Sequence, residues 1–208
     1  MASELGYVHR FEPGADPNLP PILLLHGTGG SETDLLPLGR EIAPRAALLS
    51  PRGNVLEGDM PRFFGRYREG LFDEDDVRRR ATELSLFVDG ARRAYGIAQP
   101  VALGYSNGAN IAAAVLLLHP ETMAGAILLR ATTPLAEPPT PDLSGIPVLI
   151  LSGLNDPIIP RSGAEKLART LAAAGARVER VELPAGHGLT QADVDRAKTF
   201  FARETARG

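Results

Sequence analysis

The sequence contains no cysteine, and its formal net charge is only −3 over 208 residues. Without cysteine the chain has no disulfide framework, no thiolate nucleophile and no cysteine-based metal site. A nearly balanced charge gives no global field that would attract nucleic acid or an anionic membrane, so neither is an expected partner. Long apolar runs are also missing, since residues 111–118 fall well short of the roughly 20 residues that a membrane span needs.

A secretory signal is not expected either, because residues 1–10 have no basic segment followed by an apolar one. The sequence therefore favours a cytoplasmic location. A hydrophobic fraction of 44% is ordinary for a globular protein, and we expect residues 1–208 to form one domain. An exposed helix or edge strand could pair two copies as a homodimer, but the sequence locates no interface.

Short apolar runs alternate with helical patterns along the chain. After a first edge strand at 5–11, strands are predicted at 22–25, 46–50, 101–103, 125–129, 148–151 and 178–183. Helices are predicted from 31 or 33 to 43, from 73 to 95, from 106 to 118, at 162–174 and from 190 to 206, where Thr190 and Asp193 form a capping box. Residues 53–71 read as a long irregular stretch. This alternation predicts an α/β fold with a mainly parallel sheet and helices on both faces.

The most informative motif is Gly-Tyr-Ser-Asn-Gly at 104–108, between a predicted strand and a predicted helix. This context is typical of a nucleophile elbow, a strained turn that presents a serine hydroxyl. Gly104 and Gly108 are needed because the strand and helix backbones approach closely on either side of Ser106.

A serine hydroxyl needs a base, and the base needs an orienting group. His187 lies between two glycines after the last strand, which favours it as the general base, with an exposed loop histidine as the alternative. Asp156 follows the preceding strand and is the predicted acid, with a turn or capping aspartate as the alternative. The chain order Ser106, Asp156, His187 is the one that α/β hydrolases use.

Two backbone amides are expected to bind the oxyanion of the tetrahedral intermediate, those of Asn107 and Thr28. Thr28 lies in the glycine-rich segment 27–30, which could also be read as a phosphate loop but lacks a following Lys-Ser/Thr. Because the donors are backbone groups, the two side chains need not be essential.

These segments, together with Ser-Pro-Arg-Gly-Asn at 50–54 and Met-Pro-Arg-Phe-Phe at 60–64, resemble the carboxylesterase/phospholipase branch of the α/β-hydrolase superfamily. The chain is similar to compact bacterial esterases related to acyl-protein thioesterases, and to predicted esterases associated with hydroquinone resistance. The resemblance implies a compact α/β-hydrolase fold without a separate lid domain. It also implies hydrolysis of an ester or thioester through an acyl-enzyme, with no cofactor. A small-molecule ester is the expected substrate, and no metal is expected.

One position departs from the resemblance, because Arg130 stands where a small or apolar residue is common. Arg130, with Arg52 or Arg62, is a candidate for binding a substrate carboxylate or phenolate; a salt bridge to a local acid is the alternative. Phe63 and Phe64 are candidates for the wall of an acyl or aromatic pocket, against a separate hydrophobic cluster under the loop.

The sequence thus predicts a serine carboxylesterase. A thioesterase or lysophospholipase on the same triad is an alternative within enzymes. A non-catalytic binding protein with the hydrolase fold is the alternative from a different class.

Overall fold

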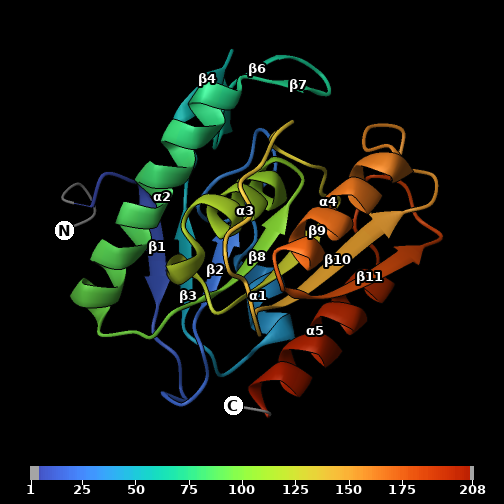
Figure 1. Cartoon of the computed structure of the whole chain (residues 1–208). Helices are drawn as coiled ribbons and strands as arrows, with labels where there is room; N and C mark the ends of the chain where they lie inside the picture. Colours follow the sequence, from blue (N-terminus) through green and yellow to red (C-terminus); the bar gives the residue numbers. More distant parts are fainter. Residues whose placement is uncertain (1–4, 207–208) are drawn as a thin grey trace.

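A computed structural model describes residues 5–206 and is built around a seven-stranded sheet with the order β1-β3-β2-β8-β9-β10-β11 (Figure 1). Its strands are β1 His9–Glu12, β2 Ile22–Leu25, β3 Leu48–Pro51, β8 Val101–Tyr105, β9 Gly125–Leu129, β10 Pro147–Gly153 and β11 Arg177–Leu183. The edge strand β1 is antiparallel to β3, and the other neighbouring pairs in this sheet are parallel. The predicted mainly parallel sheet is therefore confirmed.

Helices cover both faces of the sheet, as predicted (Figure 1). They are α1 Leu36–Ile42, α2 Glu74–Tyr95, α3 Asn107–Leu118, α4 Arg161–Ala173 and α5 Gln191–Thr205, with a short 3₁₀ turn η1 at Pro120–Thr122. Side chains of a strand alternate between its faces, so Leu23 and Leu25 join the core under α2, α3 and α4. Ile22 and Leu24 join the core under α1 and α5.

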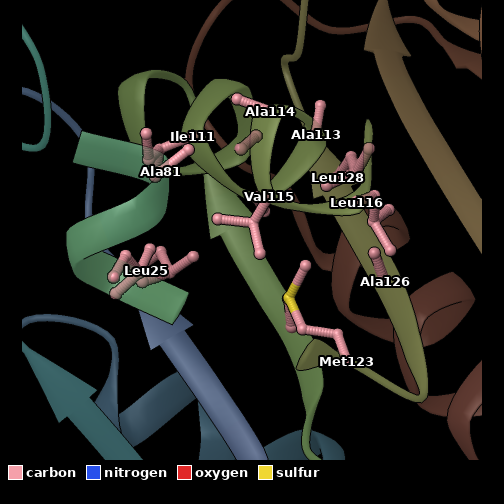
Figure 2. Packing of buried hydrophobic residues seen from close by; sticks show 14 of the residues in the cluster. Leu25, Ala81, Ile111, Ala113, Ala114, Val115, Leu116, Met123, Ala126 and Leu128 are labelled. Atoms are coloured by element: carbon pink, nitrogen blue, oxygen red, sulfur yellow. The ribbon is translucent and has the colours of Figure 1, made fainter. Parts of the chain in front are cut away.

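Helix α3 packs closely on the sheet because much of it is alanine. Figure 2 shows Ala113 and Ala114 beside Val115, within the cluster that also contains Leu25 of β2 and Leu128 of β9. Residues 107–117 of this helix are all buried. Since α3 begins directly after Ser106, this packing fixes the position of the elbow serine relative to the sheet.

Three regions differ from the sequence predictions. The first strand, expected at 5–11, is β1 at His9–Glu12, because residues 5–7 form a turn. The stretch 53–71, expected to be irregular, forms two hairpins, β4 Val55–Glu57 with β5 Met60–Arg62, and β6 Arg66–Arg68 with β7 Leu71–Phe72. These hairpins are the insertion between β3 and α2, which holds no lid domain. Helix α1 begins at Leu36 rather than near 31, because residues 32–35 form turns before Pro37 opens the helix.

No helix among residues 5–206 is long and apolar enough to cross a membrane. The predicted single domain covers 1–208, of which residues 1–4 and 207–208 lie outside the described residues. The prediction of no secretory signal rests on residues 1–10, and so in part on the same undescribed residues 1–4.

Candidate functional site

Ser106 occupies a sharp turn between β8 and α3, with a positive φ of 53° that non-glycine residues seldom adopt. Its amide donates to the Leu129 carbonyl at 2.8 Å, and its carbonyl accepts from the Asn110 amide at 3.0 Å. A Cβ on Gly104 would lie 2.6 Å from Ala109 Cα, so the close backbone approach expected for the elbow is present. Packing of β8 and α3 on either side of the turn stabilises this strained backbone conformation of Ser106.

Ser106, His187 and Asp156 form a continuous hydrogen-bonded chain. His187 Nε2 lies 3.0 Å from Ser106 Oγ, and His187 Nδ1 lies 2.9 Å from Asp156 Oδ2. The structure thus brings together three residues that follow three different strands, β8, β10 and β11. These distances are those that a nucleophile, a base and an orienting acid require.

The side chain of Asp156 is buried and accepts several hydrogen bonds. Its Oδ1 accepts hydrogen bonds from the Ile158 amide at 2.8 Å and the Ile159 amide at 3.0 Å. Burial acts to raise the pKa of Asp156, but the bonds from these amides and from His187 outweigh it and hold that pKa below its ordinary value. The carboxylate therefore stays ionised beside the imidazole.

The two predicted oxyanion residues also lie at the site. Thr28 and Asn107 line the same cavity as Ser106 and His187. Asn107 is the first residue of α3, where backbone amides have no partner within the helix. Within residues 5–206, neither the Thr28 nor the Asn107 amide donates to a protein acceptor, so both remain available to a ligand oxygen.

The side chains of these two residues are held by consecutive residues at the end of β5. Arg62 Nη1 donates to Thr28 Oγ1 at 2.8 Å, and the Phe63 amide donates to Asn107 Oδ1 at 2.7 Å. The Gly29 amide donates to the Pro61 carbonyl at 2.9 Å. The β4–β5 hairpin thus fixes the Thr28 loop against the start of α3, a role that the sequence did not indicate.

His26, at the end of β2, ties the same loop to the segment after β3. Its Nδ1 lies 2.7 Å from the Gly27 carbonyl, and its Nε2 accepts from the Gly53 amide at 3.0 Å. Burial lowers the pKa of His26 from its ordinary value, in keeping with a neutral ring that accepts at Nε2.

An open cavity of about 320 Å³ leads to Ser106. Besides Thr28, Ser106, Asn107 and His187, its lining comes from the two hairpins, the end of β8, helix α3 and the loop after β10: Met60, Arg62, Arg66, Glu69, Phe72, Tyr105, Asn110, Ile158 and Ile159. The sequence did not point to Met60, Tyr105 or the two isoleucines. Two of them had a signal in the sequence, since Tyr105 lies inside the elbow motif and Met60 begins the segment 60–64 that contributes to the family resemblance.

Both guanidinium groups of the cavity are paired with carboxylates. Arg62 lies 3.0 Å from Glu57, and Arg66 contacts both Glu57 and Glu69. Burial lowers the pKa of Arg62 from its ordinary value. These pairs leave the cavity walls close to neutral.

The other predicted substrate contacts lie elsewhere. Arg52 forms a two-pronged pair with Glu32, at 2.6 and 2.8 Å, and does not line the cavity. Phe63 and Phe64 are buried in the main hydrophobic core and lie outside the cavity lining, so the structure supports neither the predicted pocket wall nor a separate hydrophobic cluster under the loop.

Arg130 is also placed away from the cavity. Its side chain is fully buried and pairs with Asp193 at 2.7 Å, as in the alternative of a local salt bridge. A buried, paired guanidinium has no free face for a ligand, so this placement does not support the predicted substrate contact.

Metal binding has no support in the side-chain geometry, since no cluster of three or more His, Asp or Glu side chains within 5–206 could hold an ion.

The whole chain is similar to known proteins in sequence and in fold. The model of the phospholipase/carboxylesterase family matches residues 9–204. The chain is 44% identical to the hydrolase MhqD of Bacillus subtilis (strain 168) over 195 residues, covering 93% of this chain and 96% of that protein. Its structure is similar to that of the Bacillus cereus carboxylesterase, with a TM-score of 0.95, 43% identity and coverage of 97% and 96%. A carboxylesterase from Mesorhizobium loti has a TM-score of 0.84, 34% identity and 88% coverage of both chains.

Proposed function

The chain belongs to the phospholipase/carboxylesterase family, and we propose that it hydrolyses small carboxylic esters with Ser106 as nucleophile, His187 as general base and Asp156 as the group that orients His187. The observation that carries this proposal is the chain of contacts from Asp156 through His187 to Ser106, at 2.9 and 3.0 Å. The open cavity of about 320 Å³ gives an ester access to the serine hydroxyl.

The reaction proceeds in two halves. Ser106 Oγ attacks the ester carbonyl carbon while His187 Nε2 takes its proton, and the oxyanion of the tetrahedral intermediate accepts bonds from the Thr28 and Asn107 amides. Collapse of this intermediate breaks the ester C–O bond, and the imidazolium gives its proton to the departing alcohol. Water, deprotonated by His187, then attacks the acyl-enzyme and releases the carboxylic acid with free Ser106.

Thioesters and lysophospholipids are alternatives on the same residues, because a thiolate or a glycerophospho-alcohol can leave from the same tetrahedral intermediate. The near-neutral cavity walls favour an uncharged ester over an anionic one. A cytoplasmic location and a homodimer stay predictions from the sequence.

Turnover of p-nitrophenyl acetate and butyrate by the wild type and by Ser106→Ala tests the proposal. We expect Ser106→Ala to lose a factor on the order of 10⁴ to 10⁶ in kcat. Ser152→Ala is the matched control, because Ser152 is a buried serine at the end of β10 whose hydroxyl has no partner within the described residues. Absence of wild-type turnover on oxygen esters and on matched thioesters would favour the non-catalytic binding protein.

A further inference from the structure

We propose that Arg130, held by Asp193, is a positioning residue that fixes the His187 loop in its catalytic geometry; this inference rests on the proposed role of His187 as general base. Arg130 follows β9 directly and is fully buried. Its φ of 55° lies in the left-handed region, where the Cβ of an L-residue crowds the following carbonyl oxygen. Arginine at this strained position thus needs contacts that hold it there.

Every N–H of the Arg130 guanidinium has an acceptor. A guanidinium carries five N–H donors in a fixed planar fork. Nε donates to the Gly186 carbonyl at 2.9 Å, and Nη2 donates to the Gly188 carbonyl at 3.0 Å. The remaining donors reach the Leu151 carbonyl at 3.3 Å and the two carboxylate oxygens of Asp193 at 2.7 and 2.8 Å.

The two glycine carbonyls are those on either side of His187. The carbonyl of His187 itself accepts from the Tyr105 hydroxyl at 3.1 Å, so side chains bind three consecutive carbonyls of this loop. Glycine on both sides of His187 gives the backbone wide conformational freedom, and a Cβ on Gly188 would meet nothing within 4 Å. The external hydrogen bonds therefore supply the order that the loop sequence does not.

Asp193 connects this contact to the start of helix α5. Its Oδ2 accepts from the Thr190 amide at 2.8 Å, as in the capping box predicted from the sequence, and it also accepts from the Thr190 hydroxyl at 2.9 Å. Leu151 lies in β10, the strand that leads to Asp156. Arg130 thus binds the His187 loop, the strand before Asp156 and the helix after His187 as one unit.

A purely structural explanation is less satisfactory on energetic grounds. A buried ion pair contributes little net stability, and apolar residues of similar volume often replace one without loss. Apolar residues at 130 and 193 could fill the same volume, but they have no donors for the Gly186 and Gly188 carbonyls. They could therefore not fix the loop that carries His187. What the fork adds beyond an apolar core is the placement of the imidazole between Asp156 and Ser106.

The direct test is Arg130→Lys. Lysine keeps the charge opposite Asp193 and adds no backbone strain at this φ, but its single ammonium cannot bridge Gly186 and Gly188. We expect kcat to fall roughly 10- to 100-fold, the effect of misplacing a catalytic group by about 1 Å, with KM changed less than about threefold. Arg203→Lys, an exposed paired arginine on α5, is the matched control and should leave kcat unchanged.

The second readout is independent of turnover: the low-field proton resonance of the His187 Nδ1–H···Asp156 bond, recorded on Ser106→Ala with and without Arg130→Lys. We expect the resonance to broaden or vanish in the double variant. If Arg130→Lys does not fold, Arg130→Met/Asp193→Asn removes the buried charges and retains an oxygen for the Thr190 cap. A lower Tm with kcat and the resonance unchanged would overturn the proposal. Absence of wild-type turnover with the resonance present and sensitive to residue 130 would instead count against the esterase.

Discussion

Gly108 has no room for a side chain, because a Cβ there would lie 2.0 Å from the Leu25 carbonyl oxygen and 2.5 Å from that of His26. Both atoms belong to backbone, so neither can rotate away. We expect Gly108→Ala to cost about 3 kcal/mol or more and to lower Tm by roughly 6–12 °C. Thermal unfolding followed by circular dichroism measures this. Gly188→Ala is the stability control, since it meets open space, and equal Tm values for the two variants would contradict the account.

His26 gives stability a pH dependence of known sign. Burial lowers its pKa in the folded state, whereas the imidazole of the unfolded chain titrates near about 6.5. The unfolded state therefore binds more protons. The contribution of neutral His26 to the stability of the folded state is fully present above about pH 6.5. It is lost as the pH falls towards the pKa of His26 in the folded state, by at most about 1.4 kcal/mol per pH unit.

Urea unfolding at a series of pH values checks this for the wild type and for His26→Gln, whose amide oxygen can accept from Gly53 without titrating. The wild type should lose stability more steeply than the variant below about pH 6.5. Parallel curves would contradict the assignment of a neutral buried imidazole.

At this scale the sequence predicted residues whose surroundings are local. Ser106, Asp156 and His187 each follow an apolar strand and lie within two residues of glycine or proline, so their placement could be inferred without coordinates. The setting of Arg130 could not, because its partner Asp193 lies 63 residues further along the chain and the pairing depends on how α5 docks. The alternative reading of Arg130, a salt bridge to a nearby acid, could be stated without knowing that Asp193 is the partner.

The β4–β5 hairpin acts on the site as an element, through Arg62 on Thr28 and the Phe63 amide on Asn107. We expect Thr28→Val, which keeps the shape but removes the hydroxyl acceptor, to lower kcat about tenfold. Displacing an oxyanion donor should cost less than the roughly 10²- to 10³-fold loss on removing one. Steady-state kinetics on p-nitrophenyl acetate measures this.

Thr199→Val on the exposed face of α5 is the control for Thr28→Val, since that hydroxyl contacts only its own helix. If both variants keep wild-type kcat, the bond from Arg62 to Thr28 does not position the Thr28 amide for the reaction.

The hairpins were missed because their strands have only two or three residues each, too short for an alternating pattern to emerge. Their turns did carry signals, at Gly58 and Gly70, both with positive φ. The longer strands were predicted closely, and β9 at Gly125–Leu129 has the bounds expected for it. The start predicted for α1 was too early, because Ser31 and Thr33 are typical helix-capping residues but the segment 32–35 forms turns.

Across the whole molecule, the parallel sheet explains why residues far apart in the chain meet. The carboxyl ends of β2, β8, β10 and β11 lie at one edge, so Thr28, Ser106, Asp156 and His187 converge there. Periodicity predicted the layers, because both faces of each central strand are apolar. It did not predict the strand order, which depends on how the helices cross over.

The most direct test of the central claim is covalent labelling with a fluorophosphonate, which forms a P–O bond with an activated serine and releases fluoride. Intact mass and peptide mapping should show one adduct per chain, on Ser106, in the wild type. Ser106→Ala should show none, and His187→Gln should label far more slowly because the base is gone. An unlabelled wild type, or an adduct on another residue that persists in Ser106→Ala, would contradict the assignment of Ser106 as nucleophile.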